Sequence, residues 1–406
     1  MPVGLPEVPD LSPVPGIRLG SANGNISKGD KDDIALIQCT AETATAVVFT
    51  RNRFCAAPVT VARTHLAQSP ARAMIINSGN ANAGTGETGI RTADEICALV
   101  AQGLGIPASG VLPFSTGVIG SQLPVSGFEN ALPRCIDSMS EDNWLAAARA
   151  IMTTDIVPKG VSRQFDLGAS RATLTGIVKG SGMIRPDMAT MLGFVGTDAA
   201  IDPGLLDALL RQSVEKSFNR ITIDGDTSTN DACVLMATGT ADMPVIDDLS
   251  DPRCTVFARM LDEVLLILAQ SLIRDGEGAT KFVSIEITRA ASDSDARTLA
   301  FTVANSPLVK TALYASDPNW GRILAAIGRS EVEHLDIDKV GLSINGVRIL
   351  ENGGPSESYT EESGQRAMEP EEIHIGIDLD LGTGQTTVWT CDLSYDYVKI
   401  NAEYRS

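Results

Sequence analysis

Strand-like and helix-like segments follow one another without regular alternation, and this order constrains the fold more than any other feature. Short apolar runs at 43–50 and 71–79 are typical of strands, and the runs 161–167 and 170–179 form a predicted strand pair. The spacing of apolar residues predicts helices, which cover 88–104, 143–152, 203–218 and 253–274. A doubly wound sheet would need strands and helices that alternate strictly along the chain. We therefore predict an α+β protein with mixed β-sheets layered with helices.

The last third of the chain, from about residue 283, is expected to be rich in β-structure. We predict that 283–288 pairs with a strand at 297–304, and the Asn345-Gly346 dipeptide indicates a hairpin. Ser306 followed by Pro307 is typical of a helix start. A final meander is predicted from two runs joined by a Gly-Thr-Gly turn, 372–381 and 385–394.

The chain is strongly acidic, with 32 basic and 51 acidic residues among 406 and a formal net charge of -19. This charge repels phosphate backbones and anionic lipid surfaces, so neither nucleic acid nor a membrane is expected as a partner. It also gives no long-range attraction for an anionic substrate. A carboxylate ligand would therefore need a local cation.

The cysteines and the amino-terminal residues bear on the compartment. The seven cysteines are scattered, without a C-x-x-C pair, and are expected to be small buried side chains in a reducing environment. Residues 1–16 lack the basic and apolar regions of a signal or transit peptide. The most apolar window, 264–273, is much shorter than a membrane span of ~20 residues. We therefore expect a cytoplasmic protein.

Two motifs resemble ligand sites but lack residues that those sites require. Gly84, Gly86 and Gly89 form G-x-G-x-x-G, yet no acidic ribose ligand follows about twenty residues later, so we predict a tight turn into a helix. The run DGDTSTND at 224–231 lacks the glycine and the glutamate of a calcium loop. It is either an Asx-rich turn or a support beside an active site. No metal site is predicted.

The histidines do not suggest a catalytic triad. His65, His334 and His374 are isolated, and the chain has no G-x-S-x-G elbow. A nucleophile that works without histidine would be Thr, Ser or Cys, activated by an amine or a lysine.

A threonine at a chain end can supply its own base, because its α-amine, with a pKa near ~8, can take the hydroxyl proton. Thr190 lies inside the chain, so its amine would first have to be released. The hydroxyl would attack the Ala189 carbonyl, the acyl group would shift from nitrogen to oxygen, and the resulting ester would be hydrolysed. From the residues alone, an ordinary buried turn around this threonine is the alternative.

Several motifs along the chain share one resemblance. The most specific is KGSGMIRPDMATMLGF, which surrounds Thr190. Others are NSGNANAGTG, STGVIG, IMTTD, SFNRITIDGDTSTND, RDGEGATKF, DPNWGRILAAIG and the C-terminal YVKINAEYRS. Together they span nearly the whole chain. In kind and in order they resemble the ornithine acetyltransferase family, the glutamate N-acetyltransferases of the cyclic arginine-biosynthesis pathway.

This resemblance implies an N-terminal-nucleophile-like, self-processing architecture. Cleavage between Ala189 and Thr190 would give an α chain of residues 1–189 and a β chain of residues 190–406. Thr190 would carry the acetyl group, and Thr116 and Gly117 would form the oxyanion hole. The implied substrate contacts are Thr153, Lys179, Thr190, Glu277, Asn401 and Ser406. Lys179 would hold a substrate α-carboxylate, and Glu277 would pair with the amine of ornithine.

The implied reaction is ping-pong transfer of acetyl from N2-acetyl-L-ornithine to L-glutamate, without a metal or organic cofactor. The resemblance suggests an α2β2 heterotetramer and leaves open whether acetyl-CoA is also a donor. Two alternatives remain: a self-cleaving aminopeptidase or amidase of the same architecture, and an uncleaved, inactive binding protein. Arg185 and Asp187 stand where the family commonly has His and Asn. They add opposite charges near the scissile bond and could alter the cleavage rate.

Overall fold

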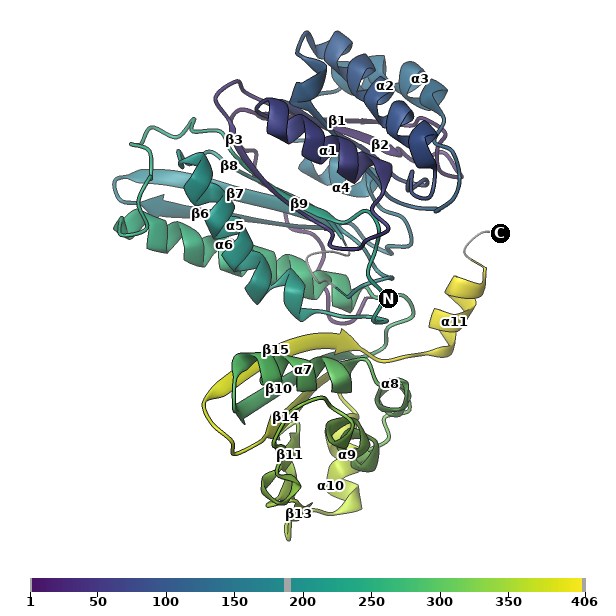
Figure 1. Cartoon of the computed structure of the whole chain (residues 1–406), viewed down its shortest axis with the longest axis vertical. Helices are drawn as coiled ribbons and strands as arrows, with labels where there is room; N and C mark the ends of the chain where they lie inside the picture. Colours follow the sequence, from purple (N-terminus) through teal and green to yellow (C-terminus); the bar gives the residue numbers. More distant parts are fainter. Residues whose placement is uncertain (1, 186–190, 404–406) are drawn as a thin grey trace.

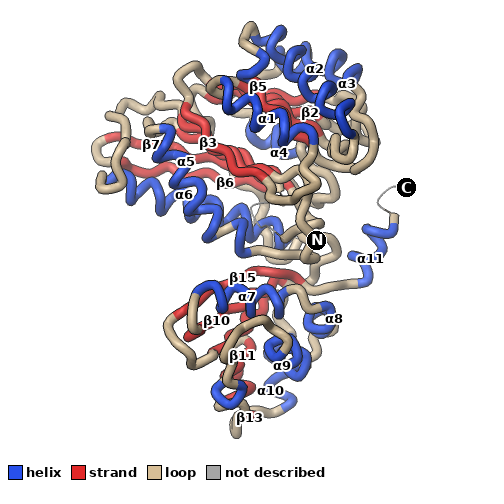
Figure 2. The backbone as a smooth tube through the Cα atoms, viewed as in Figure 1, coloured by secondary structure: helices blue, strands red, loops and turns tan. Residues whose placement is uncertain are grey.

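The computed structural model describes residues 2–185 and 191–403 and contains, within them, three mixed β-sheets with helices packed around them (Figure 1). Two sheets are stacked in a larger lobe, and the third lies in a smaller lobe (Figure 2). Strands and helices do not alternate regularly along the chain. The predicted α+β class with layered mixed sheets is confirmed.

The first sheet has the strand order β1-β2-β4-β5. Strand β2 pairs antiparallel with β1 and β4, whereas β4 and β5 are parallel and are joined through helix α2. Its strands and helices are β1 (Ile17–Ala22), β2 (Ile34–Cys39), β4 (Ala73–Asn77), β5 (Val111–Ser115), α1 (Ala57–Gln68), α2 (Gly86–Leu104), α3 (Val125–Asp137) and α4 (Trp144–Ala150).

The second sheet has the order β3-β9-β8-β7-β6. Strands β8 and β9 are parallel, and the other neighbours are antiparallel. Its strands and helices are β3 (Ala44–Phe49), β6 (Lys159–Leu167), β7 (Ser170–Lys179), β8 (Leu192–Thr197), β9 (Ala232–Ala237), α5 (Pro203–Lys216) and α6 (Pro252–Arg274).

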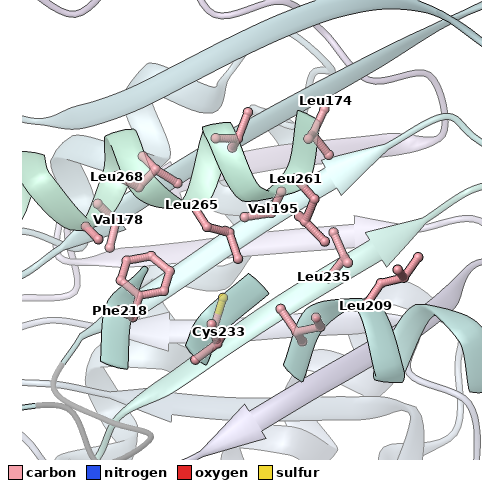
Figure 3. Close-up of a cluster of buried hydrophobic side chains, with 14 of the residues drawn as sticks. Leu174, Val178, Val195, Leu209, Phe218, Cys233, Leu235, Leu261, Leu265 and Leu268 are labelled. Carbon is pink, nitrogen blue, oxygen red and sulfur yellow. The ribbon is translucent and has the colours of Figure 1, made fainter. Parts of the chain in front are cut away.

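These two sheets form the inner layers of a four-layer arrangement of helix, sheet, sheet and helix. Between the sheets, Phe114 of β5 meets Phe194 of β8 edge to face, with ring centroids 5.3 Å apart. Apolar residues of α2 and α3 cover the outer face of the first sheet. Helices α5 and α6 cover the outer face of the second, where Leu265 and Leu268 pack towards Val178 and Val195 (Figure 3). Both sheets are therefore buried on two faces.

The third sheet has the order β13-β12-β11-β14-β10-β15 and its own apolar core. Its strands and helices are β10 (Phe282–Ala290), β11 (Gly341–Ile344), β12 (Val347–Glu351), β13 (Gly354–Pro355), β14 (Glu372–Asp378), β15 (Gly384–Cys391), α7 (Asp293–Ala304), α8 (Pro307–Tyr314), α9 (Trp320–Gly328) and α10 (Glu361–Met368). Helix α11 (Tyr395–Ala402) follows β15 and extends away from this sheet (Figure 1).

Most of the predicted elements are confirmed within a few residues. The predicted helices correspond to α2, α4, α5 and α6, and the predicted strand pair corresponds to β6 and β7. Asn345 and Gly346 form the hairpin turn between β11 and β12, and both have positive φ. Gly84 and Gly86 also have positive φ at the turn into α2, as expected. All seven cysteines are free, and six are buried.

Two strand pairings predicted in the last third are wrong, and helices α1, α3, α9, α10 and α11 were not predicted. Residues 297–304 belong to helix α7, because Ser292 caps the helix through the Asp295 N–H and the buried residues recur at helical spacing. Strands β14 and β15 do not pair as a meander: β10 lies between them, parallel to β14 and antiparallel to β15. Helix α1 lies between two correctly predicted strands.

Candidate functional site

A cavity of about 250 Å³ lies where segments from both stacked sheets and the C-terminal helix meet. Every predicted site residue that the structure describes lines this cavity, namely Thr116, Gly117, Thr153, Lys179, Glu277 and Asn401. Ala189, Thr190 and Ser406 lie outside the described residues. Met191 and Leu192, which follow Thr190 in the chain, also line the cavity.

Thr116 and Gly117 form the turn that follows β5. The Thr116 N–H donates to the Asn77 carbonyl at 2.9 Å. Gly117 has a φ of +130°, and a Cβ at this position would lie 2.3 Å from the carbonyl carbon of Gly79. Glycine is therefore required here by both conformation and space. The turn brings a hydroxyl and a backbone amide to one wall of the cavity.

Lys179 is the last residue of β7 and is buried. Its ammonium donates to the Thr116 hydroxyl at 3.2 Å. Burial lowers the pKa of Lys179 from its ordinary value, while the carboxylates of Asp155, Asp231 and Glu277 act in the opposite direction. The Lys179 ammonium therefore lines the cavity directly beside the Thr116-Gly117 turn.

A buried ion network lies behind Lys179. The Lys159 ammonium contacts Asp155 at 2.7 Å and Asp275 at 2.5 Å, and all three side chains are 0% exposed. The Asp155 carboxylate also accepts the Gly180 N–H at 2.6 Å and the Thr153 N–H at 2.9 Å. The network thus links the end of β7, the loop after α4 and the end of α6.

Glu277 lies just after α6 and faces Asn401 of the C-terminal helix. The Asn401 amide donates to the Glu277 carboxylate at 2.7 Å, and the Glu277 N–H donates to the Ser181 carbonyl at 2.7 Å. A Cβ on Gly182 would lie 2.4 Å from a Glu277 carboxylate oxygen, so glycine is what allows this approach. These contacts place a carboxylate in the same cavity as the Lys179 ammonium.

The two neighbouring threonines differ in their contacts. The Thr153 hydroxyl lies 3.5 Å from the Asp155 carboxylate, whereas the Thr154 hydroxyl lies 2.8 Å from the Ser181 hydroxyl. Both residues line the cavity.

The segment 224–231 supports the site, which is one of the two alternatives expected from its sequence. Asn230 lines the cavity, and its side-chain amide donates to the carbonyls of Ala81 and Ser115 at 2.5 and 2.9 Å. It thereby joins the second sheet to the first. The individual cavity-lining residues of this run, 228–231, were not predicted from the sequence, although the motif containing them was part of the resemblance.

Asp224 acts at the other end of the same segment. Its carboxylate accepts the N–H groups of Met183 and Ile184 at 2.7 and 2.9 Å, and the Tyr397 hydroxyl at 3.2 Å. It therefore fixes both the chain after β7 and the C-terminal helix α11.

The charges in the cavity define what can bind there. The Lys179 ammonium and the carboxylates of Glu277 and Asp231 line the same space, so an amino acid can be held by its carboxylate at one end and a cationic group at the other. Among the described residues, no group of three or more His, Cys, Asp or Glu side chains could hold a metal ion. None of the described helices is long and apolar enough to cross a membrane.

Comparison with known proteins agrees with this reading. The profile of the ArgJ family matches residues 18–406. The arginine biosynthesis bifunctional protein ArgJ of Pseudomonas syringae pv. tomato is 50% identical over 406 residues, 100% of both chains. That of Methylococcus capsulatus is 52% identical over 396 residues, 98% of this chain and 97% of the relative. The crystal structure of Bacillus halodurans ArgJ matches 53% of this chain and 100% of its own, with 42% identity and a TM-score of 0.51.

These relatives define the class of protein as the bifunctional acyltransferases of arginine biosynthesis. The chain belongs to the ArgJ family. The resemblance inferred from the sequence motifs is thereby confirmed.

Proposed function

We propose that this chain cleaves itself between Ala189 and Thr190 and then moves an acetyl group from N2-acetyl-L-ornithine to L-glutamate in the cyclic pathway of arginine biosynthesis. Acetyl-CoA serves as a second donor, in keeping with the word bifunctional in the names of the relatives. The observation that carries the proposal is one cavity that combines the Lys179 ammonium, the Glu277 carboxylate and the Thr116-Gly117 turn.

The transfer occurs in two halves. The Thr190 α-amine takes the proton of its own hydroxyl, and the hydroxyl oxygen attacks the acetyl carbonyl of acetylornithine. The Thr116 hydroxyl and the Gly117 N–H stabilise the developing oxyanion, and removal of one such donor typically raises the barrier by ~2.7 to 4 kcal/mol. Ornithine leaves with a proton on its amine. The amine of glutamate then attacks the acetyl ester and regenerates the free hydroxyl.

Substrate recognition follows from the charges in the cavity. Lys179 binds the α-carboxylate that acetylornithine and glutamate share, so one pocket serves both halves of the reaction. Glu277, oriented by Asn401, pairs with the cationic side-chain amine of ornithine. Thr153 and Ser406 complete the set of substrate contacts.

Two observations support cleavage before Thr190. Residues 190–406 make up slightly more than half of this chain, and the solved Bacillus halodurans chain matches 53% of this one over its whole length. Met191 and Leu192 line the cavity, so the chain directly after the cleavage position borders the proposed site. We further propose an α2β2 assembly of the cleaved chains, located in the cytoplasm.

Processing and transfer can be tested together. Denaturing electrophoresis of the wild type is expected to give two bands in place of one at 42.7 kDa. Thr190→Ala is expected to remain one band and to lose transfer. Transfer that survives in Thr190→Ala would contradict the choice of nucleophile, and a persistent single wild-type band would contradict self-cleavage.

The hydrolase alternative differs in the acceptor. Incubation with acetylornithine, with and without glutamate, separates the two activities. We expect sustained release of ornithine to depend on glutamate. Release that is indifferent to glutamate would indicate an aminopeptidase or amidase of the same architecture.

A further inference from the structure

A second, larger cavity of about 720 Å³ opens beside the first. The two cavities share four lining residues, Gly117, Ile119, Thr153 and Thr154. The smaller cavity, of about 250 Å³, suits a free amino acid, whereas an acyl donor with a long arm requires additional space. The second cavity provides this space directly beside the Thr116-Gly117 turn.

Close backbone contacts hold the start of the loop 26–31 beside this turn. A Cβ on Gly79 would lie 2.8 Å from the Ser27 Cα, and a Cβ on Gly117 would lie 2.3 Å from the Gly79 carbonyl carbon. The three segments can approach this closely because two of the residues are glycines. The Ser27 N–H also donates to the buried Asp33 carboxylate at 2.7 Å. Ser27 is therefore held at the wall of the second cavity, and the exposed Lys28 and Lys31 follow it in the chain.

This wall carries positive charge in an otherwise acidic chain. Lys28 and Lys31 line the second cavity, and none of the described residues that line it is a carboxylate. The Lys31 ammonium donates to the Met152 carbonyl at 2.9 Å, which holds it beside Thr153. Asp30 is exposed and does not line the cavity, and Asp32 accepts a serine hydroxyl of β1 at 2.6 Å. The cavity can therefore attract an anionic group in spite of the net charge of -19.

Apolar side chains complete the lining. Ile26, Val118, Ile119, Met152 and Ile400 line the same cavity. A ligand that fits this lining has a partly apolar arm and ends in phosphate groups.

We propose that the second cavity binds the arm of a phosphate-bearing acyl thioester of the acetyl-CoA class, with Lys28 and Lys31 contacting its phosphates and the thioester carbonyl reaching the Thr116-Gly117 turn. This inference rests on the proposed function. The acetyl carbon forms a bond to the Thr190 hydroxyl oxygen, the C–S bond breaks, and the hydroxyl proton passes through the α-amine to the departing thiolate. Acetylornithine, which has no such arm, does not use this cavity.

The test compares three acetyl donors with glutamate as acceptor. They are acetyl-CoA, the short thioester S-acetyl-N-acetylcysteamine, which lacks phosphates, and acetylornithine. The variant Lys28→Ala/Lys31→Ala is expected to lower kcat/KM for acetyl-CoA about tenfold or more, because charge-assisted contacts to phosphate are lost. For the other two donors kcat/KM should stay within about twofold. The matched control, Lys216→Ala/Lys339→Ala, removes two exposed lysines elsewhere and should behave as the wild type.

Each outcome decides the inference. A loss of equal size for all three donors, or no loss for acetyl-CoA, would overturn it. A wild type that uses acetylornithine but not acetyl-CoA would also overturn it and leave acetylornithine transfer intact. Failure of the wild type with acetylornithine would instead refute the proposed function.

Discussion

At the scale of single residues, two glycines give the candidate site its shape. Gly117 permits the turn after β5 to pack on Gly79, and Gly182 permits Glu277 to approach the chain after β7. Neither contact leaves space for a side chain, so glycine at these two positions allows the Thr116-Gly117 turn and the Glu277 carboxylate to reach the cavity.

Gly182→Ala is expected to displace the Glu277 carboxylate, because the new Cβ would lie 2.4 Å from its oxygen. We expect KM for acetylornithine to rise by about tenfold, the equivalent of ~1.4 kcal/mol, with a smaller effect on glutamate, which has no cationic side chain. Steady-state kinetics with each substrate varied in turn measure this difference. Gly204→Ala, close to a carboxylate at the start of α5, is a control outside the cavity. Equal effects on both substrates would argue against a role of Glu277 in binding the ornithine amine.

Lys179 makes the site sensitive to alkaline pH. Its pKa is lowered by burial, so the ammonium loses its proton at a lower pH than an exposed lysine would. Substrate binding should weaken as pH rises through this pKa. Folding stability should rise over the same pH range, because the Lys179 amine keeps its proton to a higher pH in the unfolded chain than in the folded chain.

The measurement is KM for acetylornithine and the denaturation midpoint as functions of pH. Lys179→Met should abolish the Lys179 contribution to both profiles and raise KM strongly at neutral pH. A variant profile that still shows the alkaline rise in KM would assign the titration to another group.

At the scale of elements, α11 carries a functional residue although none of its own residues is buried. Polar contacts hold it at its N-cap and at two residues within it. The Ser394 hydroxyl donates to the Gly278 carbonyl at 2.6 Å, the Tyr397 hydroxyl donates to Asp224 at 3.2 Å, and the Asn401 amide donates to Glu277 at 2.7 Å. Because no residue of α11 is fully buried, these hydrogen bonds contribute much of what holds the helix in place.

Tyr397→Phe removes the hydrogen bond to Asp224 and keeps the ring. A hydrogen bond to a charged group contributes ~1.5 kcal/mol or more, so we expect kcat/KM for acetylornithine to fall about tenfold with little change in thermal stability. Tyr395→Phe is the matched control, since Tyr395 is 81% exposed. Kinetics and melting curves of both variants test this. An equal loss of activity in the two variants would contradict the proposed role of the contact with Asp224.

At the scale of the whole molecule, the buried Lys159 network ties together three segments of the larger lobe that border the cavity. Burial alone would raise the pKa of Asp155, but Lys159 and Lys179 reverse this effect and hold it well below its usual range. A carboxyl whose pKa is depressed by folding stabilises the folded chain at pH values above the pKa that it has in the unfolded chain. This contribution is lost as pH falls through the folded value.

Lys159→Met should leave two buried carboxylates without their cation and cost about 3 to 5 kcal/mol. The deficit should shrink on acidification, because protonation of the carboxylates removes the uncompensated charge. Lys216→Met breaks the partly exposed pair with Asp262 and should cost less than about 1 kcal/mol. Denaturant unfolding at neutral and acidic pH provides the comparison. Similar losses of unfolding free energy in the two variants would show that burial does not make the Lys159 ion network more important for stability than an exposed ion pair.

The sequence predicted local structure well where a helix buries only one face or where a turn requires particular residues. Helices α2, α5 and α6 have a continuous apolar face, and the Asn345-Gly346 turn requires positive φ at both residues. The same reasoning failed at 297–304, because a short apolar run suits either a strand or a buried helix. Capping by Ser292 would have been the distinguishing signal.

Composition, local periodicity and motifs were enough to predict the α+β class, the family and the candidate residues Thr116, Lys179 and Glu277. Tertiary structure decided that these residues share one cavity and that Lys159 lies buried behind it. It also placed β10 between β14 and β15. These features arise from contacts between segments far apart in the chain. Such contacts are selected by the joint packing of the sheets, and no local pattern encodes them.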